Sequence, residues 1–297
     1  MSVAGTPDVA VPPDAGPNAP LAIICGGGSL PVAVAEAAKR RGRRVVMFPV
    51  RGWADPGAGE AYPHHWIAVG QLGRLRRLIR QEGCRDVVFI GSAVRPSLGT
   101  IRLDWLGLTM LPQIAAMYRG GDDHLLSGVA RVFEEHGFRL LGAHEVAPDI
   151  LIPIGPVGRL QPSERDRADI ARGLALLDAI GPFDIGQAVV VAANHVLAVE
   201  AAEGTDAMLE RIADLRLKGR VPTPPGVGVL VKAPKPGQDQ RFDLPAIGPR
   251  TVAEVARAGL AGIAVVAGGS VIAEPEAVAT AADKANIFVV GMPERSP

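Results

Sequence analysis

The sequence predicts two α/β domains, the first with a Rossmann-like, mostly parallel sheet and the second with a mixed sheet and helices. In the first half, short apolar runs alternate with helical patterns, as in a parallel sheet covered on both faces. The chain of 297 residues is long enough for about two domains. Prolines and glycines cluster at 148–160, which we interpret as a linker. We therefore expect domains at 20–147 and 161–297.

The first domain is expected to follow a leader at residues 1–19, whose Pro, Ala and Gly content indicates disorder. Apolar runs predict strands, and amphipathic segments between them predict helices. The expected strands are 21–25, 44–50, 86–92 and 138–146, and the expected helices are 29–42, 71–83 and 124–137, with broken or continuous helix around 103–120.

The second domain is expected to begin with a helix at 163–181, because Ser163 and Asp166 have the spacing of a capping box. Two hairpins are predicted, one turning at Asn194 and His195 and one over 262–274. Further helices are expected at 205–219, 251–260 and 275–286, and further strands at 226–232 and 287–292.

The composition excludes several classes of protein. The 31 basic and 31 acidic residues cancel, so there is no overall electrostatic argument for nucleic acid, although a local basic patch stays open. Cys25 and Cys84 form no metal-binding or redox pair, which is typical of a reduced, cytoplasmic protein. No apolar run is long enough to span a membrane, and the N-terminus does not look like a signal peptide.

A glycine turn joins the first predicted strand to the first helix. Gly26, Gly27 and Gly28 are followed by Ser29, Leu30 and Pro31, which matches neither the GxGxxG pattern nor a Walker A loop. Two interpretations stay open. The turn is a tight connection that needs positive φ, or it is a cradle for a nucleotide at a helix N-terminus, in which case Gly26–Gly28, Leu30 and Pro31 contact the substrate.

A charged, proline-rich loop follows the strand expected at 226–232. Between Lys232 and Pro249 it holds two lysines, one arginine, two aspartates and four prolines. Prolines limit the backbone freedom of such a loop. Its cations, Lys232, Lys235 and Arg241, could neutralise phosphate oxygens, and its carboxylates, Asp239 and Asp243, could hold a metal ion or polarise water. The alternative is a solvated loop with weak surface ion pairs.

Acidic groups also occur at two predicted helix starts. Asp122 and Asp123 begin one helix, where a capping role explains one of them without any ligand. We keep both as second-rank candidates for metal or substrate contact. Thr205, in the stretch "EGTD", is either a helix cap or a substrate contact.

Seven motifs occur in an order similar to that of LpxI-type UDP-2,3-diacylglucosamine pyrophosphatases. They are "CGGGSLP", "GSAVRP", "GDDHLL", "GAHEV", "DIGQAVVV", "VLAVEAAEGTDAML" and "VKAPKPGQDQRFDLPAIGPRTV", and the resemblance covers residues 20–292. Each motif is weak, whereas seven in order are specific. Cys25 stands where the family usually has Ala, and residues 1–19 extend beyond the family pattern.

The resemblance implies a fold and a reaction. The family has two α/β domains, here an N-terminal nucleotide-binding and a C-terminal catalytic one, with substrate bound between them. Water cleaves the pyrophosphate of UDP-2,3-diacylglucosamine to UMP and 2,3-diacylglucosamine 1-phosphate, by attack on the phosphorus nearer the sugar. The reaction is a step of lipid A synthesis on the cytoplasmic side of a Gram-negative inner membrane.

The resemblance also implies a site. The family requires a divalent cation such as Mg²⁺, for which Asp243, Asp122 and Asp123 are the candidate ligands. The family's catalytic aspartate in its "DLP" motif corresponds to Asp243, and an acid is expected at Asp239. Peripheral contact with the inner membrane and a homodimer stay open. So do two other functions: a sugar-nucleotide transferase, and a nucleotide- or lipid-binding regulator without catalysis.

Overall fold

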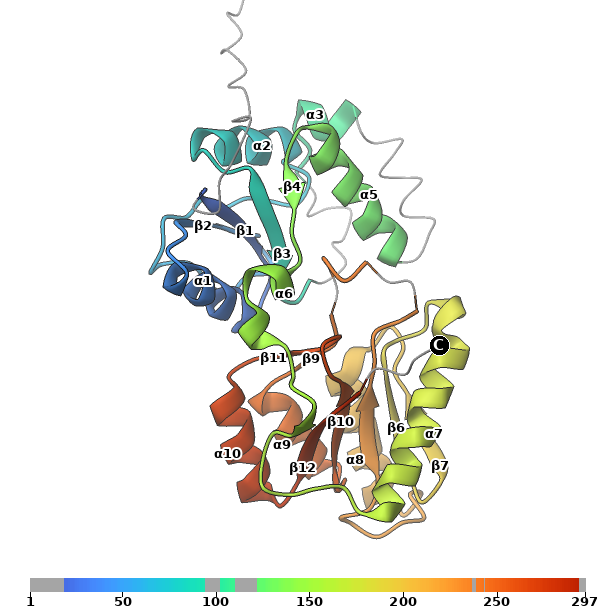
Figure 1. Cartoon of the computed structure of the whole chain (residues 1–297). Helices are drawn as coiled ribbons and strands as arrows, with labels where there is room; N and C mark the ends of the chain where they lie inside the picture. Colours follow the sequence, from blue (N-terminus) through green and yellow to red (C-terminus); the bar gives the residue numbers. More distant parts are fainter. Residues whose placement is uncertain (1–18, 94–101, 110–121, 237–238, 243, 294–297) are drawn as a thin grey trace, which may run out of the picture. The chain divides into compact units, whose positions relative to one another are not determined.

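The computed structural model describes residues 19–93, 102–109, 122–236, 239–242 and 244–293, with the backbone alone for 122–127 and 129. The chain divides into two compact units, Met1–Pro148 and Asp149–Pro297 (Figure 1). Both units are α/β, as predicted. No helix among the described residues combines the length and the apolar character needed to cross a bilayer.

The first unit contains a four-stranded sheet in the order β2-β1-β3-β4, in which every pair is parallel. The mostly parallel sheet predicted from the alternating pattern is therefore confirmed. Its strands are β1 (Leu21–Cys25), β2 (Val45–Pro49), β3 (Asp86–Ile90) and β4 (Arg139–Leu140), and its helices are α1 (Leu30–Arg40), α2 (Leu72–Gln81), α3 (Trp105–Thr109), α5 (Asp122–Glu135) and α6 (Ala143–Val146).

Two elements of the first unit differ from the expectation. The strand predicted at 138–146 pairs only over Arg139–Leu140, and α6 occupies Ala143–Val146 instead. Glu145 accounts for part of this difference, because its carboxylate accepts a hydrogen bond from the N–H of Gly142 at 2.7 Å and so begins a helical turn. Of the stretch 103–120, only α3 is helical within the described residues, and 110–120 lies outside them.

The second unit contains a six-stranded mixed sheet in the order β5-β12-β10-β8-β6-β7. The inner strands β12, β10 and β8 are parallel, whereas β5, β6 and β7 run antiparallel to their neighbours. The strands are β5 (Gly155–Pro156), β6 (Ala188–Ala192), β7 (His195–Val199), β8 (Val229–Lys232), β10 (Gly262–Val266) and β12 (Phe288–Met292), and the helices are α7 (Glu164–Ile180), α8 (Gly204–Leu217), α9 (Pro249–Arg257) and α10 (Pro275–Ala285).

Alternate residues of this sheet pack on opposite faces. Val189, Val191, Val229 and Val231 lie in one core with the apolar residues of α7. Their sequence neighbours in the same strands lie in a second core with α8, α9 and α10. Figure 1 shows α7 against one face of the sheet and α9 and α10 against the other. Helices on both faces explain why these strands are apolar throughout.

Local sequence rules decide several ends and turns. The predicted capping box is present: the N–H of Ser163 donates to Asp166 Oδ2 at 2.9 Å, and the N–H of Asp166 donates to Ser163 Oγ at 3.3 Å. The hairpin of β6 and β7 turns at Ala193 and Asn194, one residue before the predicted position, and both residues have positive φ. The buried carboxylate of Asp169 accepts both N–H groups of this turn.

The hairpin predicted over 262–274 is wrong. Strand β10 pairs with β8 and β12 in the large sheet, whereas β11 (Val271–Ile272) pairs in parallel with β9 (Ala246–Ile247) in a separate small sheet. The residues between them, Ala267–Ser270, are a crossover loop and not a hairpin turn.

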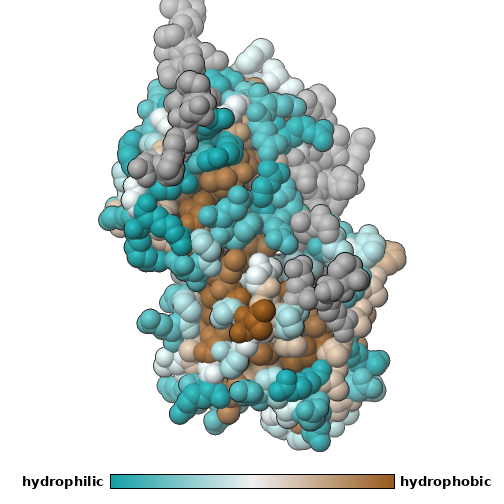
Figure 2. Space-filling view, viewed as in Figure 1, coloured by the Kyte–Doolittle hydropathy of each residue, from teal (hydrophilic) through white to brown (hydrophobic). Residues whose placement is uncertain are grey.

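The stretch 148–160, expected as a linker, is packed within the second unit from residue 149 onward. After a short 3-10 turn at Pro148–Ile150, Ile152 is buried, β5 pairs with β12, and the N–H of Arg159 donates to Asp283 Oδ1 at 2.8 Å. Prolines and glycines here make an edge strand with turns on either side. Figure 2 shows that hydrophilic residues cover much of the visible surface of each unit and that each unit also has hydrophobic areas.

Candidate active site

The glycine turn of the first unit is in backbone contact with the loop that follows β3. The N–H of Gly26 donates to Ile90 O at 2.8 Å, and Gly27 and Ser92 exchange two backbone hydrogen bonds at 2.9 Å. A Cβ atom on Gly26 would lie 2.3 Å from Ser92 O, and one on Gly91 would lie 2.8 Å from the carbonyl carbon of Gly26. Glycine is needed here because two chain segments pass closer than any side chain permits.

The third glycine has a different reason. Gly28 has a φ of +89°, and its N–H donates to Asp55 Oδ2 at 3.0 Å. All three glycine N–H groups therefore have protein acceptors, an arrangement that favours the tight connection over an open phosphate cradle. Leu30 and Pro31 form the first turn of α1. Contact of these residues with a nucleotide stays a prediction.

Cys25, directly before the glycines, is not a nucleophile in this arrangement. The thiol is fully buried, and burial raises its pKa to about 12. It is therefore a neutral thiol at ordinary pH, and it donates to Ile23 O at 3.2 Å.

In the second unit, Lys232 connects the two ends of the charged loop. It is the last residue of β8 and only 5% exposed. Its ammonium group donates to Ala246 O, at the far end of the loop, and to Thr205 Oγ1, both at 3.0 Å. A buried ammonium with such acceptors closes the loop at its base.

Sequence reasoning missed the residue that completes this network. Glu200 is 7% exposed; its Oε1 accepts from Thr205 Oγ1 at 2.7 Å, and its Oε2 accepts from the N–H of Gln187 at 2.9 Å. Thr205 is thus not the helix cap: α8 begins at Gly204, and the hydroxyl joins Glu200 to Lys232. The only signal in the sequence was an acid that ends an otherwise apolar strand.

The other charged residues of the loop that the structure describes, Lys235, Asp239 and Arg241, lie in ion pairs. Lys235 Nζ lies 2.5 Å from Asp184 Oδ1, and Arg241 contacts both carboxylate oxygens of Asp239, through Nε at 2.9 Å and Nη2 at 2.7 Å. Hydrogen bonds from Arg241 hold the pKa of Asp239 below its usual value, although partial burial opposes this. Asp239 is therefore a carboxylate that Arg241 already neutralises.

A second glycine-containing loop lies beside the charged loop. Gly268 and Gly269 follow β10, and a Cβ on Gly269 would lie 3.1 Å from Pro234 Cγ. Since β8 and β10 are parallel neighbours, both loops leave the sheet at its carboxyl edge, which is where α/β proteins bind ligands. The misassigned hairpin hid this loop from the sequence analysis.

Three candidate acids are not placed by the structure. Asp243 lies outside the described residues, and of Asp122 and Asp123 only the backbone is described, at the start of α5 as expected. Within the described parts of the chain, no group of three His, Cys, Asp or Glu side chains could hold a metal ion. The described carboxylate of the loop, Asp239, is paired with Arg241, so the placed residues do not make a metal site by themselves.

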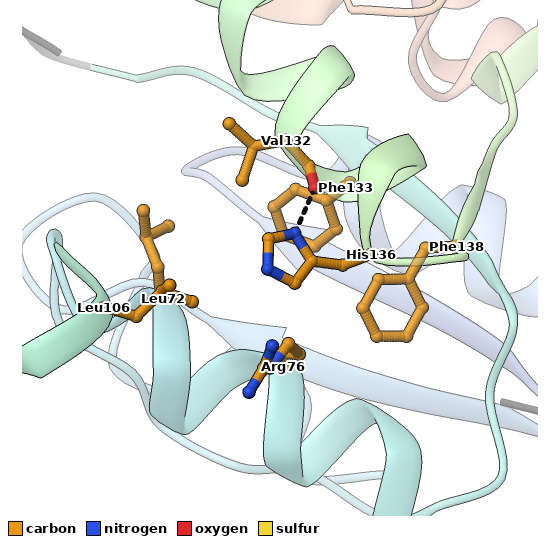
Figure 3. A pocket seen from close by; sticks show the side chains of 7 residues that line it. All are labelled: Leu72, Arg76, Leu106, Val132, Phe133, His136 and Phe138. Carbon is orange, nitrogen blue, oxygen red and sulfur yellow. Dashed lines mark hydrogen bonds between the residues drawn. The ribbon is translucent and has the colours of Figure 1, made fainter. Parts of the chain in front are cut away.

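The first unit also has a small apolar hollow between α2, α3 and α5. Figure 3 shows Val132, Phe133 and His136 of the α5 end facing Leu72 and Leu106, with His136 Nδ1 hydrogen-bonded to Val132 O at 2.7 Å. Its cavity volume of about 10 Å³ is far below the ~300–1,000 Å³ typical of ligand pockets. It is too small to enclose a lipid-linked sugar nucleotide.

These features define a two-unit α/β protein with a braced, charged loop at the carboxyl edge of its second sheet. The LpxI N-terminal domain model matches residues 20–150, and the LpxI C-terminal domain model matches residues 153–290. The chain therefore belongs to the LpxI family.

The comparison with a curated relative agrees with this family. The chain is 43% identical over 280 residues to "UDP-2,3-diacylglucosamine pyrophosphatase LpxI" of Caulobacter vibrioides, covering 93% of this chain and 99% of that protein. Among solved structures, the biotin carboxylase domain of the Hydrogenobacter thermophilus 2-oxoglutarate carboxylase matches at 14% identity with a TM-score of 0.22, covering 71% of this chain and 43% of that chain.

Proposed function

We propose that this chain hydrolyses the pyrophosphate bond of UDP-2,3-diacylglucosamine, giving UMP and 2,3-diacylglucosamine 1-phosphate in lipid A biosynthesis. The observation that carries the proposal is the 43% identity, over nearly the full length of both chains, to the Caulobacter pyrophosphatase. We further propose that water attacks the phosphorus nearer the sugar. Heavy-oxygen water tests this point, because the label is then expected in the sugar phosphate and not in UMP.

The chemistry needs positioned cations and an oriented water molecule, because phosphoryl transfer depends mainly on positioning and on charge stabilisation. The charged loop supports this role. Lys232 closes its base, and the ion pairs of Lys235 and Arg241 hold two further cations on it. A diphosphate that approached the loop would compete with Asp184 and Asp239 for these cations.

We assign the catalytic role to Asp243, as the carboxylate that orients or deprotonates the attacking water. The pairing of Asp239 with Arg241 makes Asp239 a positioning residue for that cation and not the water-activating group. We also propose dependence on Mg²⁺ or another divalent cation. Activity is then expected to disappear in EDTA and to return with added Mg²⁺. Full activity in EDTA would contradict the requirement for a divalent cation and would leave the proposed reaction unaffected.

The decisive experiment measures UMP release by the purified chain from the diacylated sugar nucleotide in the presence of Mg²⁺. Asp243→Asn is expected to abolish release and to keep the thermal unfolding temperature of the wild type. The matched control is Asp214→Asn, an exposed aspartate on α8, which is expected to leave the rate unchanged. A near-normal rate for Asp243→Asn would refute the assignment of the catalytic residue.

The same assay separates the two other functions. A transferase would need an acceptor, so UMP release in water alone excludes it. A regulator without catalysis would bind the sugar nucleotide tightly and release no UMP. We place the reaction in the cytoplasm, at the membrane surface where a substrate with two acyl chains resides.

A further inference from the structure

Helix α2 in the first unit is strongly basic. It has four arginines among its ten residues, Leu72–Gln81, and no acidic residue. Arg74 and Arg77 are exposed, and neither lies in an ion pair with any residue that the structure describes. Some exposed arginines elsewhere, such as Arg159 and Arg211, do have acidic partners. Two exposed arginines without an acidic partner on one short helix are a local excess of positive charge.

The segment before and within α3 lies directly against the start of α2. The N–H of Arg102 donates to Val69 O at 2.9 Å, and the N–H of Arg74 donates to Asp104 Oδ2 at 2.8 Å. A Cβ on Gly107 would lie 2.4 Å from Gly70 O, so α3 is in backbone contact with the turn that leads into α2. The two helices therefore present one continuous surface, and Figure 1 shows them side by side in the first unit.

This surface also exposes large apolar side chains. Trp105 is 79% exposed, Leu108 48% and Leu103 39%. An isolated exposed leucine needs no explanation, but three large apolar residues within six positions form a patch. We call Arg74, Arg77, Arg102, Leu103, Trp105 and Leu108 the α2–α3 surface.

The acidic groups near this surface do not cancel its charge. Both oxygens of Asp104 accept backbone N–H groups, from Arg74 and from Gly107. Glu82, just after α2, contacts Arg44 and His65. The α2–α3 surface itself carries three arginines, Arg74, Arg77 and Arg102, and the one acidic residue within its segments is Asp104.

We propose that the α2–α3 surface docks the enzyme on a bilayer that contains anionic lipid. Arginines are attracted to an anionic leaflet, whereas Trp and Leu enter the headgroup region, where an indole ring is favoured. Both kinds of residue stand side by side here, and within the described chain Arg74 and Arg77 lack acidic partners. The choice of a membrane as partner rests on the proposed function, because a diacylated substrate is a membrane lipid.

The test is flotation of the full-length protein with vesicles of equal parts phosphatidylglycerol and phosphatidylcholine, compared with phosphatidylcholine alone. The wild type is expected to bind the anionic vesicles and to be released by salt. Each arginine at an anionic leaflet strengthens binding about fivefold. The variant Arg74→Gln/Arg77→Gln is therefore expected to bind about 25-fold more weakly, and Trp105→Ala is expected to lose binding to a similar extent.

Control variants remove the same kinds of side chain, exposed arginine and exposed large apolar, from the second unit. Arg165→Gln/Arg220→Gln removes two exposed arginines, and Leu217→Ala removes a side chain that is 87% exposed. Both controls are expected to bind vesicles like the wild type. Trp105 supplies a second readout, since its fluorescence is expected to shift to shorter wavelength with anionic vesicles, a shift absent from Trp105→Ala.

Several outcomes would overturn the proposal. One is equal binding to neutral and anionic vesicles, and another is wild-type binding by the α2–α3 variants. In a third, those variants still bind vesicles but no longer release UMP from detergent-dispersed substrate. That result would place the residues in the substrate site. Vesicle binding does not depend on turnover, so an inactive protein that still docks would refute the proposed reaction and leave the docking surface standing.

Discussion

Lys232 shows how burial changes the meaning of a charged residue. The sequence alone predicts that Lys232 is a cation for phosphate oxygens, and its contact with substrate stays a prediction. The structure shows an ammonium group that joins β8, Thr205 and the end of the loop at Ala246. A buried charge needs such partners, because leaving it unpaired away from water would cost several kcal/mol. Lys232 therefore positions the loop on which the proposed catalytic residue lies.

Thr205→Val tests this network, because it removes the hydroxyl between Lys232 and Glu200 and keeps the shape. Two buried polar groups would each lose a hydrogen bond, so we expect a loss of about 2 kcal/mol in unfolding free energy and a lower kcat. Urea denaturation and UMP release measure the two effects. Thr205→Ser is expected to restore both, and Thr280→Val, at an exposed site on α10, should change neither. A wild-type rate in Thr205→Val would show that the network does not position the loop.

At the scale of elements, one buried carboxylate joins three strands of the first sheet. Asp86 begins β3 and is 1% exposed. It accepts from Arg43, just before β2, at 2.7 Å, and from two nitrogens of Arg139, the first residue of β4, at 2.8 Å. Burial alone would raise the pKa of Asp86, but the hydrogen bonds from Arg139 and Arg43 outweigh it and hold the pKa below its usual value.

Asp86→Asn is expected to lower the unfolding free energy at pH 7 by about 3 kcal/mol, since the largely buried guanidinium of Arg43 loses its carboxylate. A lowered folded-state pKa stabilises the protein above the unfolded value of about 4, and this contribution is lost as the pH falls through the folded pKa. The difference between wild type and variant should therefore shrink below about pH 4. Urea denaturation at both pH values measures it. The control is Asp283→Asn, which breaks the pair with the 80% exposed Arg159 and is expected to lower the unfolding free energy much less. An equal decrease for the two variants would contradict the proposed effect of burial.

For the whole molecule, the boundary between the two units is a physical prediction. The second unit has its own cores on both faces of its sheet, and its edge strand β5 comes from the stretch expected as a linker. A fragment of residues 149–297 is therefore expected to unfold in a single cooperative transition in urea.

The matched fragment, residues 161–297, lacks β5 and the buried Ile152 and is expected to be less stable by about 3 kcal/mol or to aggregate. Urea denaturation followed by circular dichroism compares the two. Equal stability of the two fragments would show that residues 149–160 act as a linker after all.

Local patterns in the chain were enough to predict most helices and strands, the parallel first sheet, the mixed second sheet and the capping box of α7. These features depend on periodicity and on side chains a few residues apart. Motifs in a shared order were also enough to predict the family. Positions at which a turn and a strand compete, such as 138–146 and 262–274, could not be predicted in this way, because they depend on which strands pair.

What the charged residues do became clear only from the folded chain. Lys232 donates to Thr205 and Ala246, and Lys235 contacts Asp184. The N–H of Gly28 donates to Asp55. Most of these partners lie far away along the chain. The contact between α2 and the segment that carries Arg102 and Trp105 was likewise visible only in the folded chain. Charge and exposure depend on what packs against a residue in space, and a linear sequence does not state which distant segments meet.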